Sequence, residues 1–600
     1  MAKILVRVGQ NQELVLEVSP GRSVFSALRE EGIMVDSFCG GMGTCGKCKV
    51  TVVSGNGEVT PEEKALLDAG ELEKGIRLAC YLPATDGLLV ELGPSGEMVM
   101  LTMGLDTAVS LDPLVRERIV CLPTPTLTDQ RDVVTQLLER ESLSAIDPHC
   151  LPQLSTIPSG AEFTMTIIDD RVEATSLEPS QGICGVAFDI GTTTMAAYLV
   201  DLATGEELAV HSVANPQRQY GADVISRIHY GETDPQGALE LQQCLVQGLN
   251  ALIDRLCLLS GRSLETIQLV TIAANTVMLH TLLGVRALGI ANAPFAPVFT
   301  DQIRVRPEKL GLKMAPNGLV VLLPSVSGYV GADIIGDLLA CNFPADPHWH
   351  GLLIDIGTNG EIVLGNGSKT VACSTAAGPA FEGANIKHGM PGILGAISSF
   401  FLVDQKASFE TVGAGSPLGI CGSGLISIVA ELIEHEFVDS SGAFTPFEEL
   451  EKWQQALMTT VDGQPGFIVV PRELSATGQA IVLTQKDVRE VQLAKGAIQA
   501  GVLVLLQEAG ITLPQVDQLF LAGGFGNYLN VRHAAVVGLI PKELEDRVTR
   551  IGNGAGLGAK LCLVNKGHLE RADDLRKTIR YVELSSHLEF HSFFMEAMFF

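Results

Sequence analysis

The chain has 600 residues, of which 46% are hydrophobic and 18% charged. At roughly 150 residues per domain it should form about three or four compact units, with little disorder. Its 69 acidic and 41 basic residues give a formal net charge of -28. That charge repels phosphate backbones and anionic lipids, which argues against nucleic acid or a membrane surface as a partner.

Residues 1–20 alternate apolar and polar side chains and lack the apolar core of a signal peptide. The long apolar stretch at 318–341 is interrupted by Pro324, Asp333 and Asp337, so it is too broken to cross a bilayer. We therefore expect a cytoplasmic protein without a membrane span.

The first 93 residues predict a small β-grasp domain. Alternating runs at 3–8 and 13–18 indicate a hairpin, and Ser23 is placed to cap the short helix that follows. A capping box at 60–63 opens a second helix, and strands are expected near 77–81 and 88–92.

The next segments are predicted to be a linker at 94–107, which contains Pro94, Gly96 and Gly104, and a small α/β middle domain at 108–182. In the middle domain we expect a helix at 132–141 and a strand at 162–169.

From residue 183 to 585 the pattern changes to buried-type strands, Gly-rich turns and long helices. The segments GVAFDIGTTTMAAYLVD at 185–201 and GLLIDIGTNGEIVLG at 351–365 share a strand, an Asp-Ile-Gly-Thr turn and a second apolar strand. They predict two similarly folded halves with a cleft between them. The predicted fold class is therefore α/β multidomain, with a terminal helix at 586–600.

Three cysteines cluster in a Gly-rich loop of the first domain. Cys39, Cys45 and Cys48 have the spacing C-x5-C-x2-C, and Cys80 follows in the same domain. Four thiolates can hold two irons, and the intervening glycines let backbone amides approach the sulfides. The alternatives are a packing core, which such a polar loop disfavours, and zinc, which normally takes paired C-x2-C knuckles.

With these residues, segment 1–93 resembles the [2Fe-2S] ferredoxins. The loop has one residue more than the plant-type C-x4-C-x2-C spacing and is similar to the adrenodoxin and putidaredoxin branch. The other nine cysteines are scattered singly through apolar surroundings, and we expect most of them to be inert core residues.

The two Asp-Ile-Gly-Thr turns are candidate phosphate sites. Turn hydroxyls and amides can bind phosphate oxygens, while a carboxylate can hold the water shell of Mg²⁺. One such turn alone is equally explained as an ordinary strand connection, but two in equivalent contexts are harder to dismiss. The candidate residues are Asp189, Gly191, Thr192, Thr193 and Thr194 in the first turn and Asp355, Gly357, Thr358, Asn359 and Gly360 in the second.

Two further Gly-rich turns are candidate nucleoside contacts. The strand at 516–522 leads into Gly523, Gly524, Phe525 and Gly526, where missing side chains would let a flat base lie against the backbone. Asn553 and Gly554 begin a similar turn in GNGAGLGAK at 552–560, although close helix packing is the favoured explanation of that turn taken alone.

In this order, DIGTTT, DIGTNG and LAGGFG resemble the phosphate and adenosine motifs of the superfamily of acetate and sugar kinases, heat-shock-cognate ATPases and actin. NTVMLHTLLG (275–284), AAGPAFEGANIKHGM (376–390), GICGSG (419–424) and LTQKDVREVQLAKGAI (483–498) resemble signatures of a narrower group, the ATP-dependent reductive activators of corrinoid proteins. Related activators carry [4Fe-4S] ligands in a Cys-rich tail, whereas this chain resembles the [2Fe-2S]-headed branch.

The resemblance implies an iron-sulfur reductase that uses ATP to convert inactive cob(II)amide into active cob(I)amide. Cys39, Cys45, Cys48 and Cys80 would relay the electron, with Asp189 and Asp355 positioning Mg²⁺-bound water. Glu382 is a candidate for orienting the attacking water, although a surface or capping role is as well supported. The implied partners are a corrinoid protein, a ferredoxin or reductase as electron donor, and a second copy of the chain through the ATPase domain.

Three rival functions stay open at this stage. They are a small-molecule kinase with a fused redox domain, a chaperone-like ATPase, and an ATP-driven electron donor to another acceptor such as a 2-hydroxyacyl-CoA dehydratase. The chaperone alternative would need a peptide-binding domain after the ATPase, where only 586–600 follows.

Overall fold

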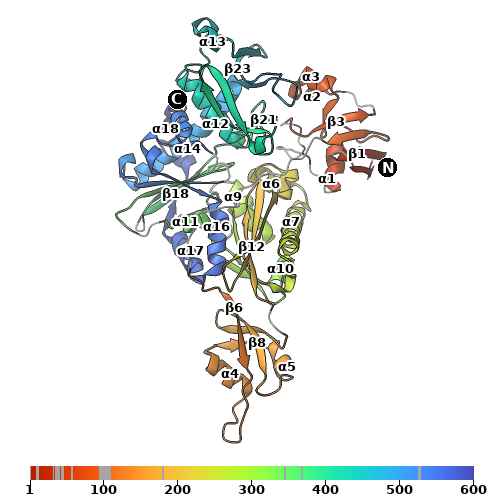
Figure 1. The fold of residues 1–600 in the computed structure, drawn as a ribbon, viewed down its shortest axis with the longest axis vertical. Coiled ribbons are helices and arrows are strands. Elements are labelled where there is room, and N and C mark those ends of the chain that lie inside the picture. The colour runs from red at the N-terminus through yellow and green to blue at the C-terminus, as the bar shows by residue number, and fades with distance from the viewer. Residues whose placement is uncertain are drawn as a thin grey trace.

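The computed structural model describes residues 2–8, 12–19, 21–31, 33, 35, 41, 43, 46–55, 59–92, 110–178, 181–343, 346–366, 369–523 and 529–600. Figure 1 shows an N-terminal domain at the upper right, a slender domain at the lower end, and a two-lobed body between them. None of the helices in these ranges combines the length and apolar composition that crossing a bilayer requires.

The N-terminal domain is a five-stranded sheet of order β2-β1-β5-β3-β4, with β1 antiparallel to β2 and parallel to β5. The predicted hairpin and the Ser23 cap are confirmed, because Ser23 Oγ accepts the amide of Ser26 at 3.2 Å. The strand predicted at 77–81 ends at Leu78, where a turn begins. The elements are β1 (Ala2–Val8), β2 (Gln12–Val18), α1 (Val24–Glu30), β3 (Lys49–Ser54), α2 (Pro61–Leu66), α3 (Ala69–Glu73), β4 (Ile76–Leu78) and β5 (Leu89–Leu92).

A buried ion pair ties α2 to β4 in this domain. Arg77 donates through Nε and Nη2 to Glu63 at 2.9 and 2.6 Å, and the amide of Leu78 donates to the same carboxylate at 3.0 Å. Glu63 also closes the predicted capping box by accepting the Thr60 amide at 3.1 Å. Burial alone would raise the pKa of Glu63, but these hydrogen bonds outweigh it and lower the pKa.

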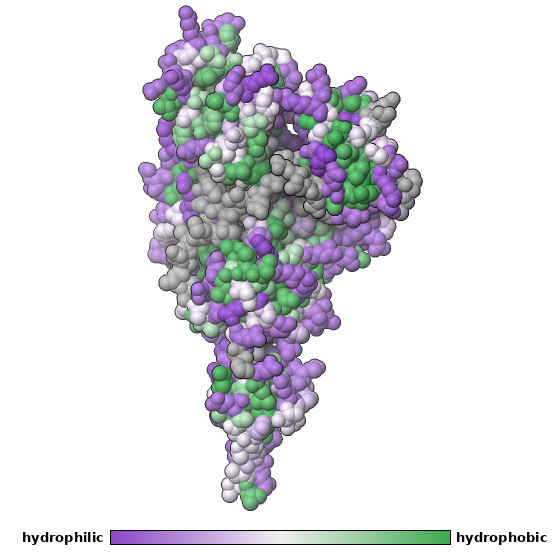
Figure 2. All heavy atoms as spheres, turned by 45° about the vertical axis from the view of Figure 1, so that its right-hand side comes forward, coloured by the Kyte–Doolittle hydropathy of each residue, from purple (hydrophilic) through white to green (hydrophobic). Residues whose placement is uncertain are grey.

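The slender domain is a four-stranded sheet of order β6-β8-β9-β7 covered by two helices, and Figure 2 shows it as a narrow extension from the body. Its core contains Leu137, Phe163 and Met165. The predicted helix is present, with Asp132 as its N-cap. The elements are β6 (Val115–Cys121), α4 (Val133–Glu141), β7 (Ala145–Ile146), α5 (Cys150–Leu154), β8 (Glu162–Ile168) and β9 (Arg171–Ser176).

The first lobe of the body contains a six-stranded sheet of order β12-β11-β10-β13-β15-β14. Its elements are β10 (Cys184–Ile190), β11 (Thr194–Asp201), β12 (Glu207–Ala214), α6 (Val224–Thr233), α7 (Gly237–Ser260), β13 (Ile267–Ala274), α8 (Thr276–Leu282), α9 (Leu288–Ala291), β14 (Ile303–Val305), α10 (Pro307–Leu310), β15 (Leu319–Leu322) and α11 (Ala332–Ala340).

The second lobe contains a six-stranded sheet of order β26-β25-β16-β17-β18-β27. Its elements are β16 (Gly351–Ile356), β17 (Gly360–Gly365), β18 (Thr370–Thr375), β19 (Ala396–Val403), β20 (Lys406–Thr411), β21 (Gly419–Ile420), α12 (Gly422–Glu434), α13 (Lys452–Gln455), β22 (Met458–Val461), β23 (Gln464–Val470), β24 (Ile481–Thr484), α14 (Gln485–Ala509), β25 (Gln518–Ala522), α15 (Val531–Val537), β26 (Val548–Gly552), α16 (Gly554–Val564), α17 (Lys566–Thr578), β27 (Ile579–Tyr581) and α18 (Phe590–Ala597).

The two sheets share one topology, which confirms the predicted duplication. In each, three antiparallel strands are followed by two parallel ones, giving β12-β11-β10-β13-β15 in the first lobe and β18-β17-β16-β25-β26 in the second. Because the Asp-Ile-Gly-Thr turns join β10 to β11 and β16 to β17, they lie at equivalent places in their lobes.

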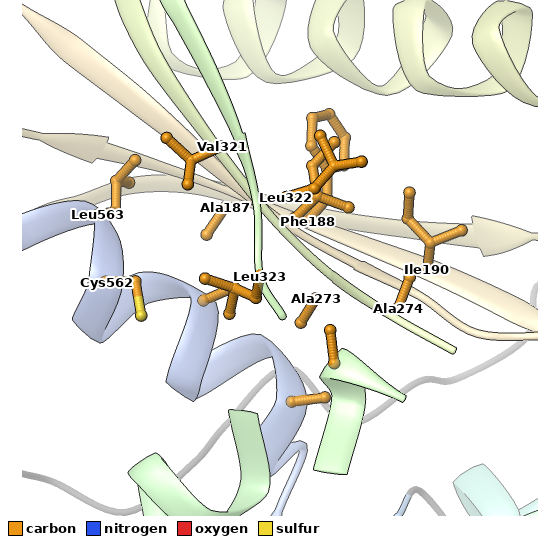
Figure 3. Packing of buried hydrophobic residues seen from close by; sticks show 14 of the residues in the cluster. Ala187, Phe188, Ile190, Ala273, Ala274, Val321, Leu322, Leu323, Cys562 and Leu563 are labelled. Atoms are coloured by element: carbon orange, nitrogen blue, oxygen red, sulfur yellow. The ribbon is translucent and has the colours of Figure 1, made fainter. Parts of the chain in front are cut away.

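Helix α16 returns from the second lobe to the first and packs on its sheet. Figure 3 shows Cys562 and Leu563 of this helix beside Ala187 of β10 and Leu323, all within one hydrophobic core. Every residue of β10 is buried, as expected for a strand covered on both faces.

The last helix, α18, packs against α14. Phe590 and Phe593 contact the core of the second lobe, and Gln492 on α14 donates to the carbonyl of Met598 at 2.7 Å. Residues 93–109, which include the predicted linker, lie outside the described residues. The division of the chain at 93, 107, 182 and 585 stays a prediction.

We predict that Glu63→Gln destabilises the N-terminal domain at pH 7 by about 3 kcal/mol, because it leaves Arg77 buried without a counter-charge. Folding lowers the pKa of Glu63. Its contribution to the free energy of unfolding is therefore fully present above the unfolded pKa of about 4.3 and is lost as the pH falls through the lower pKa of the folded state. Hydrogen exchange of peptides from 46–92 should accelerate by about 100-fold. The exposed neighbour provides the control Glu62→Gln, and equal exchange in the two variants would contradict the prediction.

Candidate functional site

A cavity of about 340 Å³ lies between the two lobes. Both Asp-Ile-Gly-Thr turns line it, together with α11, the segment after β18 and the start of α16. The residues predicted from sequence that line it are Asp189, Gly191, Thr192, Thr193, Thr194, Asp355, Gly357, Thr358, Asn359, Glu382, Gly523, Asn553 and Gly554.

The first turn is fixed by a backbone hydrogen bond and by polar side chains from other elements. The amide of Gly191 donates to Thr194 O at 2.9 Å, and Asn215 Nδ2 donates to Gly191 O at 2.8 Å. The buried guanidinium of Arg227 donates to Thr192 O. Burial lowers the pKa of Arg227 to about 9. Asn275, which caps α8, donates to Thr192 Oγ1 at 3.2 Å, so the orientation of that hydroxyl is set from a second element.

The second turn is closed by a hydrogen bond from the amide of Gly357 to Asn359 O at 2.9 Å. Gly360 does not line the cavity, contrary to our expectation. A Cβ added there would meet Ile498 and Thr375 at 2.8 Å, so close packing against α14 and β18 explains this glycine.

Glu382 bridges the two turns. Thr193 Oγ1 donates to Glu382 Oε2 at 3.0 Å, and Thr358 Oγ1 donates to the other carboxylate oxygen. The residue ends the short 3₁₀ turn η3 (Pro379–Glu382). One carboxylate therefore engages a hydroxyl from each lobe, which the surface or capping role would not require.

Three acidic residues complete the cavity and were not among the sequence candidates. Asp333 and Asp337 come from α11, and Glu361 follows the second turn on β17. Oδ2 of Asp337 is buried and has no hydrogen-bond partner among the described residues. The only sequence signal was that Asp333 and Asp337 interrupt an otherwise apolar stretch at helical spacing.

Burial raises the pKa values of these carboxyl groups. It raises the pKa of Asp189 to about 7, with the charge of Asp333 as the next cause. The pKa of Asp355 rises to about 7 for the same two reasons, and burial raises that of Asp333 to about 6. Burial and the charge of Asp355 raise the pKa values of Asp337 and Glu361 well above their ordinary range.

This arrangement fits a divalent cation with a polyphosphate. An unpartnered buried carboxylate oxygen and several closely placed acids are the oxygen ligands that Mg²⁺ prefers, directly or through water. The threonine hydroxyls and turn amides provide phosphate contacts beside them. At Gly523 a Cβ would lie 2.5 Å from Asp355 Oδ1, so only glycine lets this backbone approach the acidic cluster.

Several predicted residues lie outside the described part of the chain. These are Gly524, Phe525 and Gly526 of the third Gly-rich turn, and Cys39 and Cys45 of the cysteine loop.

Asn553 caps α16 by accepting the amide of Gly556 at 2.8 Å, and its Nδ2 donates to the hydroxyl of Tyr198 at 3.1 Å.

The two described cysteines of the quartet lie together in the N-terminal domain. Cys48 Sγ and Cys80 Sγ are 3.3 Å apart. Gly41, which precedes them in the chain, is tightly packed, because a Cβ added there would meet the ring of Phe25 at 2.6 Å. Two thiol sulfurs at this distance beside a Gly-rich loop fit the expected cluster.

The scattered cysteines differ from this pair. Cys121 is exposed on β6, whereas Cys150, Cys373 and Cys562 are buried. Burial raises the pKa of Cys150 to about 11 and raises those of Cys373 and Cys562 further. These three thiols therefore stay protonated near neutral pH, as expected for inert core residues.

The N-terminal domain contacts both lobes of the body. The guanidinium of Arg29 on α1 lies 5.4 Å from the ring of Tyr220 and 5.8 Å from that of Tyr230, both in the first lobe. On the other side, Lys47 Nζ donates to Ile386 O of the second lobe at 3.5 Å. Lys47 directly precedes Cys48.

Fold and site together define a two-lobed ATPase of the actin and sugar-kinase type that carries a ferredoxin domain. Three family models match the chain: the 2Fe-2S iron-sulfur cluster binding domain at 8–85, the RACo middle region at 184–346, and the C-terminal domain of RACo, the ASKHA domain, at 350–600.

Related proteins cover the chain almost completely. The corrinoid activation enzyme RamQ of Eubacterium limosum is 32% identical over 97% of both chains. A solved structure of a reductive activator for corrinoid,iron-sulfur protein has 32% identity, covers 100% of this chain and 98% of its own, and superposes with a TM-score of 0.75. The [Co(II) methylated amine-specific corrinoid protein] reductase of Methanosarcina barkeri is 23% identical over 68% of this chain and 76% of its own. The chain belongs to the RACo family of corrinoid-activating proteins.

We predict that Asp337→Asn stabilises the protein in the absence of nucleotide, raising its melting temperature at pH 8 by about 3 °C, because one buried like charge is removed. The native carboxyl groups hold more protons than the unfolded ones between pH 4 and 7, so wild-type stability falls as pH rises through this range. In the variant, stability should fall less steeply as the pH rises.

The same substitution should reduce the stabilisation by Mg²⁺ and ATP, because it removes a carboxylate that fits a cation. Thermal melts between pH 5.5 and 8, with and without Mg²⁺ and ATP, measure both effects. Asp574→Asn, on the exposed face of α17, is the control. An Asp337→Asn protein that melts lower at pH 8 would show that this carboxyl group stabilises the fold directly.

Proposed function

We propose that this protein uses ATP to reduce the cob(II)amide of a corrinoid protein to cob(I)amide. The observation that carries the proposal is the combination, in one chain, of a ferredoxin-type cysteine loop and a two-lobed ATPase against which that domain packs. The names of its relatives, an activation enzyme, a reductase and a reductive activator of corrinoid proteins, support the same reaction.

The electron balance is simple. One electron passes from the reduced cluster to cob(II)amide, which becomes cob(I)amide, and a low-potential ferredoxin or reductase returns one electron to the cluster. No bond forms or breaks at the protein in this transfer. The chain's residues therefore hold the cluster and the nucleotide, orient the partner and couple the nucleotide state to electron transfer.

We assign the holding roles as follows. Cys39, Cys45, Cys48 and Cys80 bind the [2Fe-2S] cluster, which supplies the one-electron redox chemistry when bound. Asp189 and Asp355 position the water shell of Mg²⁺. Thr192, Thr193, Thr194, Thr358 and Asn359 contact the phosphates, and the turns at 523–526 and 553–554 contact the nucleoside.

ATP is required to supply free energy, because the electron transfer is uphill for an ordinary ferredoxin. A ligand shifts an equilibrium only if it binds one conformation better than another. Phosphates and a cation that contact turns from both lobes stabilise the closed cleft. A domain that touches Tyr220 in one lobe and Ile386 in the other is then repositioned when the lobes move.

Glu382 and Ile386 lie four residues apart in one segment. The first contacts both phosphate turns, and the second accepts from Lys47 beside the cluster loop. Asp487 at the start of α14 accepts the amide of Lys387, the residue after Ile386, at 2.8 Å, which fixes this end of the segment to the second lobe. The segment therefore links the nucleotide cavity to the N-terminal domain.

We also propose a cytoplasmic location, a ferredoxin or reductase as donor and a homodimer formed through the ATPase domain. A reducing compartment is consistent with thiol ligands and with buried cysteines that stay protonated.

We predict that cob(I)amide forms only when ATP is present with this protein, a low-potential reductant and a cob(II)amide protein. Its absorbance can be followed continuously. Cys48→Ser should lose the visible cluster absorbance and reduce cob(I) formation to background, whereas Cys121→Ser, on the surface of the slender domain, should retain both. Reduction that proceeds equally without ATP would sink the proposal. ADP release stimulated by small metabolites instead would favour the kinase alternative.

We predict that Glu382→Gln binds ATP severalfold more tightly, because a carboxylate that faces the phosphates is neutralised. If Glu382 also orients the attacking water, ATP turnover should fall by about 100-fold. Isothermal titration and single-turnover hydrolysis separate the two effects. A role confined to folding would weaken binding and turnover together, and that result would contradict the assignment.

A further inference from the structure

A second cluster of potential ligands lies in the second lobe, apart from the nucleotide cavity. Glu431 and Glu434 project from the last turn of α12, and His533 projects from α15. One ligand atom from each lies within 4.8 Å of the others. None of the three lines the cavity between the lobes.

The surroundings of His533 allow the tautomer in which Nδ1 carries the proton. The hydroxyl of Ser427 lies 3.0 Å from Phe400 O and can donate to it, which leaves its oxygen free to accept from another group. His533 Nδ1 lies 2.7 Å from this oxygen and can donate to it. In a neutral ring, Nε2 then carries the lone pair.

That lone pair faces a carboxylate. His533 Nε2 lies 3.4 Å from Glu431 Oε1, and their side chains are only 1% and 7% exposed. Two electron pairs that face each other in a buried place repel, unless a cation or an additional proton lies between them.

Both carboxylates are also oriented by donors outside the cluster. Glu431 Oε2 accepts the amide of Leu402 at 2.9 Å, and Glu434 Oε1 accepts from Arg532 at 2.6 Å. Metal-binding histidines and carboxylates typically show such outer hydrogen bonds, with the histidine donating its second N–H to an acceptor. Ser427 provides that acceptor for His533.

The charge balance favours a cation as well. Two carboxylates at the C-terminal end of α12 face the negative end of the helix dipole. Arg532 offsets one of these charges, and His435 Nδ1 lies 3.6 Å from Glu431 Oε2 at the edge of the cluster. An unbalanced negative charge is left beside a buried imidazole.

We propose that Glu431, Glu434 and His533 form a binding site for a divalent transition-metal ion, with zinc as the ion that best fits one imidazole and two carboxylates. Zinc accepts nitrogen and oxygen ligands at about 2.0–2.2 Å in a tetrahedron that solvent can complete. The three ligand atoms would approach one another by about 1 Å or slightly more, which rotation of the two glutamate side chains permits.

A bound ion would join α15 to α12. Helix α15 begins at Val531, close after the Gly-rich turn at 523–526 that is predicted to contact the nucleoside. The ion would therefore have a structural role, because it would hold together two helices beside the nucleotide cavity. This site is distinct from the proposed oxygen-rich site for Mg²⁺.

The test measures zinc and iron in the full-length protein with its cluster. After dialysis with one equivalent of zinc, we expect one zinc per chain, and competition with a chromophoric chelator gives its affinity. Zinc X-ray absorption should show only nitrogen and oxygen ligands. Sulfur ligands would mean that zinc has entered the cysteine loop, and that result would overturn the proposal.

Three variants complete the test. His533→Gln and Glu434→Gln should each weaken zinc binding by about 100-fold. Glu436→Gln, two residues beyond the site and exposed, should not change it. Iron content and ATP binding report whether each variant is folded, and Glu434→Gln at the solvent edge decides the question if His533→Gln is unfolded. Equal affinity in all three variants, or no zinc above background, would reduce the cluster to a buried imidazolium–carboxylate pair.

Discussion

Repulsion among buried carboxyl groups at the junction of the two lobes is the interaction on which the rest of this structure depends. Asp189 and Asp355 enter from the two turns, Asp333 and Asp337 from α11, and Glu361 from β17. In surroundings of low dielectric such groups are tolerated only when they hold protons or when a cation neutralises them. Under the proposed function, binding of Mg²⁺ with ATP would relieve a repulsion that folding has created, and that free energy would be available to move the lobes.

A close helix crossing assembles this cluster. A Cβ added to Gly558 on α16 would lie 2.2 Å from Gly336 O on α11, and one added to Gly554 would lie 2.4 Å from Asp337 Oδ1. Glycine at these positions lets α16 approach α11 closely enough to place both helix starts at the cavity. Because α16 follows β26 of the second lobe yet packs on the sheet of the first, a change in the angle between the lobes must act on this crossing.

The ferredoxin domain is positioned to respond to such a change. Arg29 lies over aromatic rings of the first lobe, and Lys47 donates to Ile386 of the second, four residues after Glu382. The contacts that hold the phosphate turns together and the contact that reaches the cysteine loop thus belong to one short segment. In the proposed function, coupling of nucleotide state to electron transfer would need no long path through the core, only a shift of this segment relative to the first lobe.

The sequence by itself determined the β-hairpin and caps of the first domain, the duplicated sheets, the spacing of the cysteine loop and thirteen of the residues that line the cavity. These features depend on local periodicity, turn chemistry and short motifs. It did not reveal that Glu382 joins both turns, that Gly360 serves packing, or that Asp333, Asp337 and Glu361 complete the acidic cluster. Only the tertiary structure decided those roles, because they depend on burial and on distances between residues far apart in the chain. Glu431, Glu434 and His533 are the clearest case, since α15 follows α12 by about 100 residues and no spacing in the sequence indicates that their ligand atoms meet.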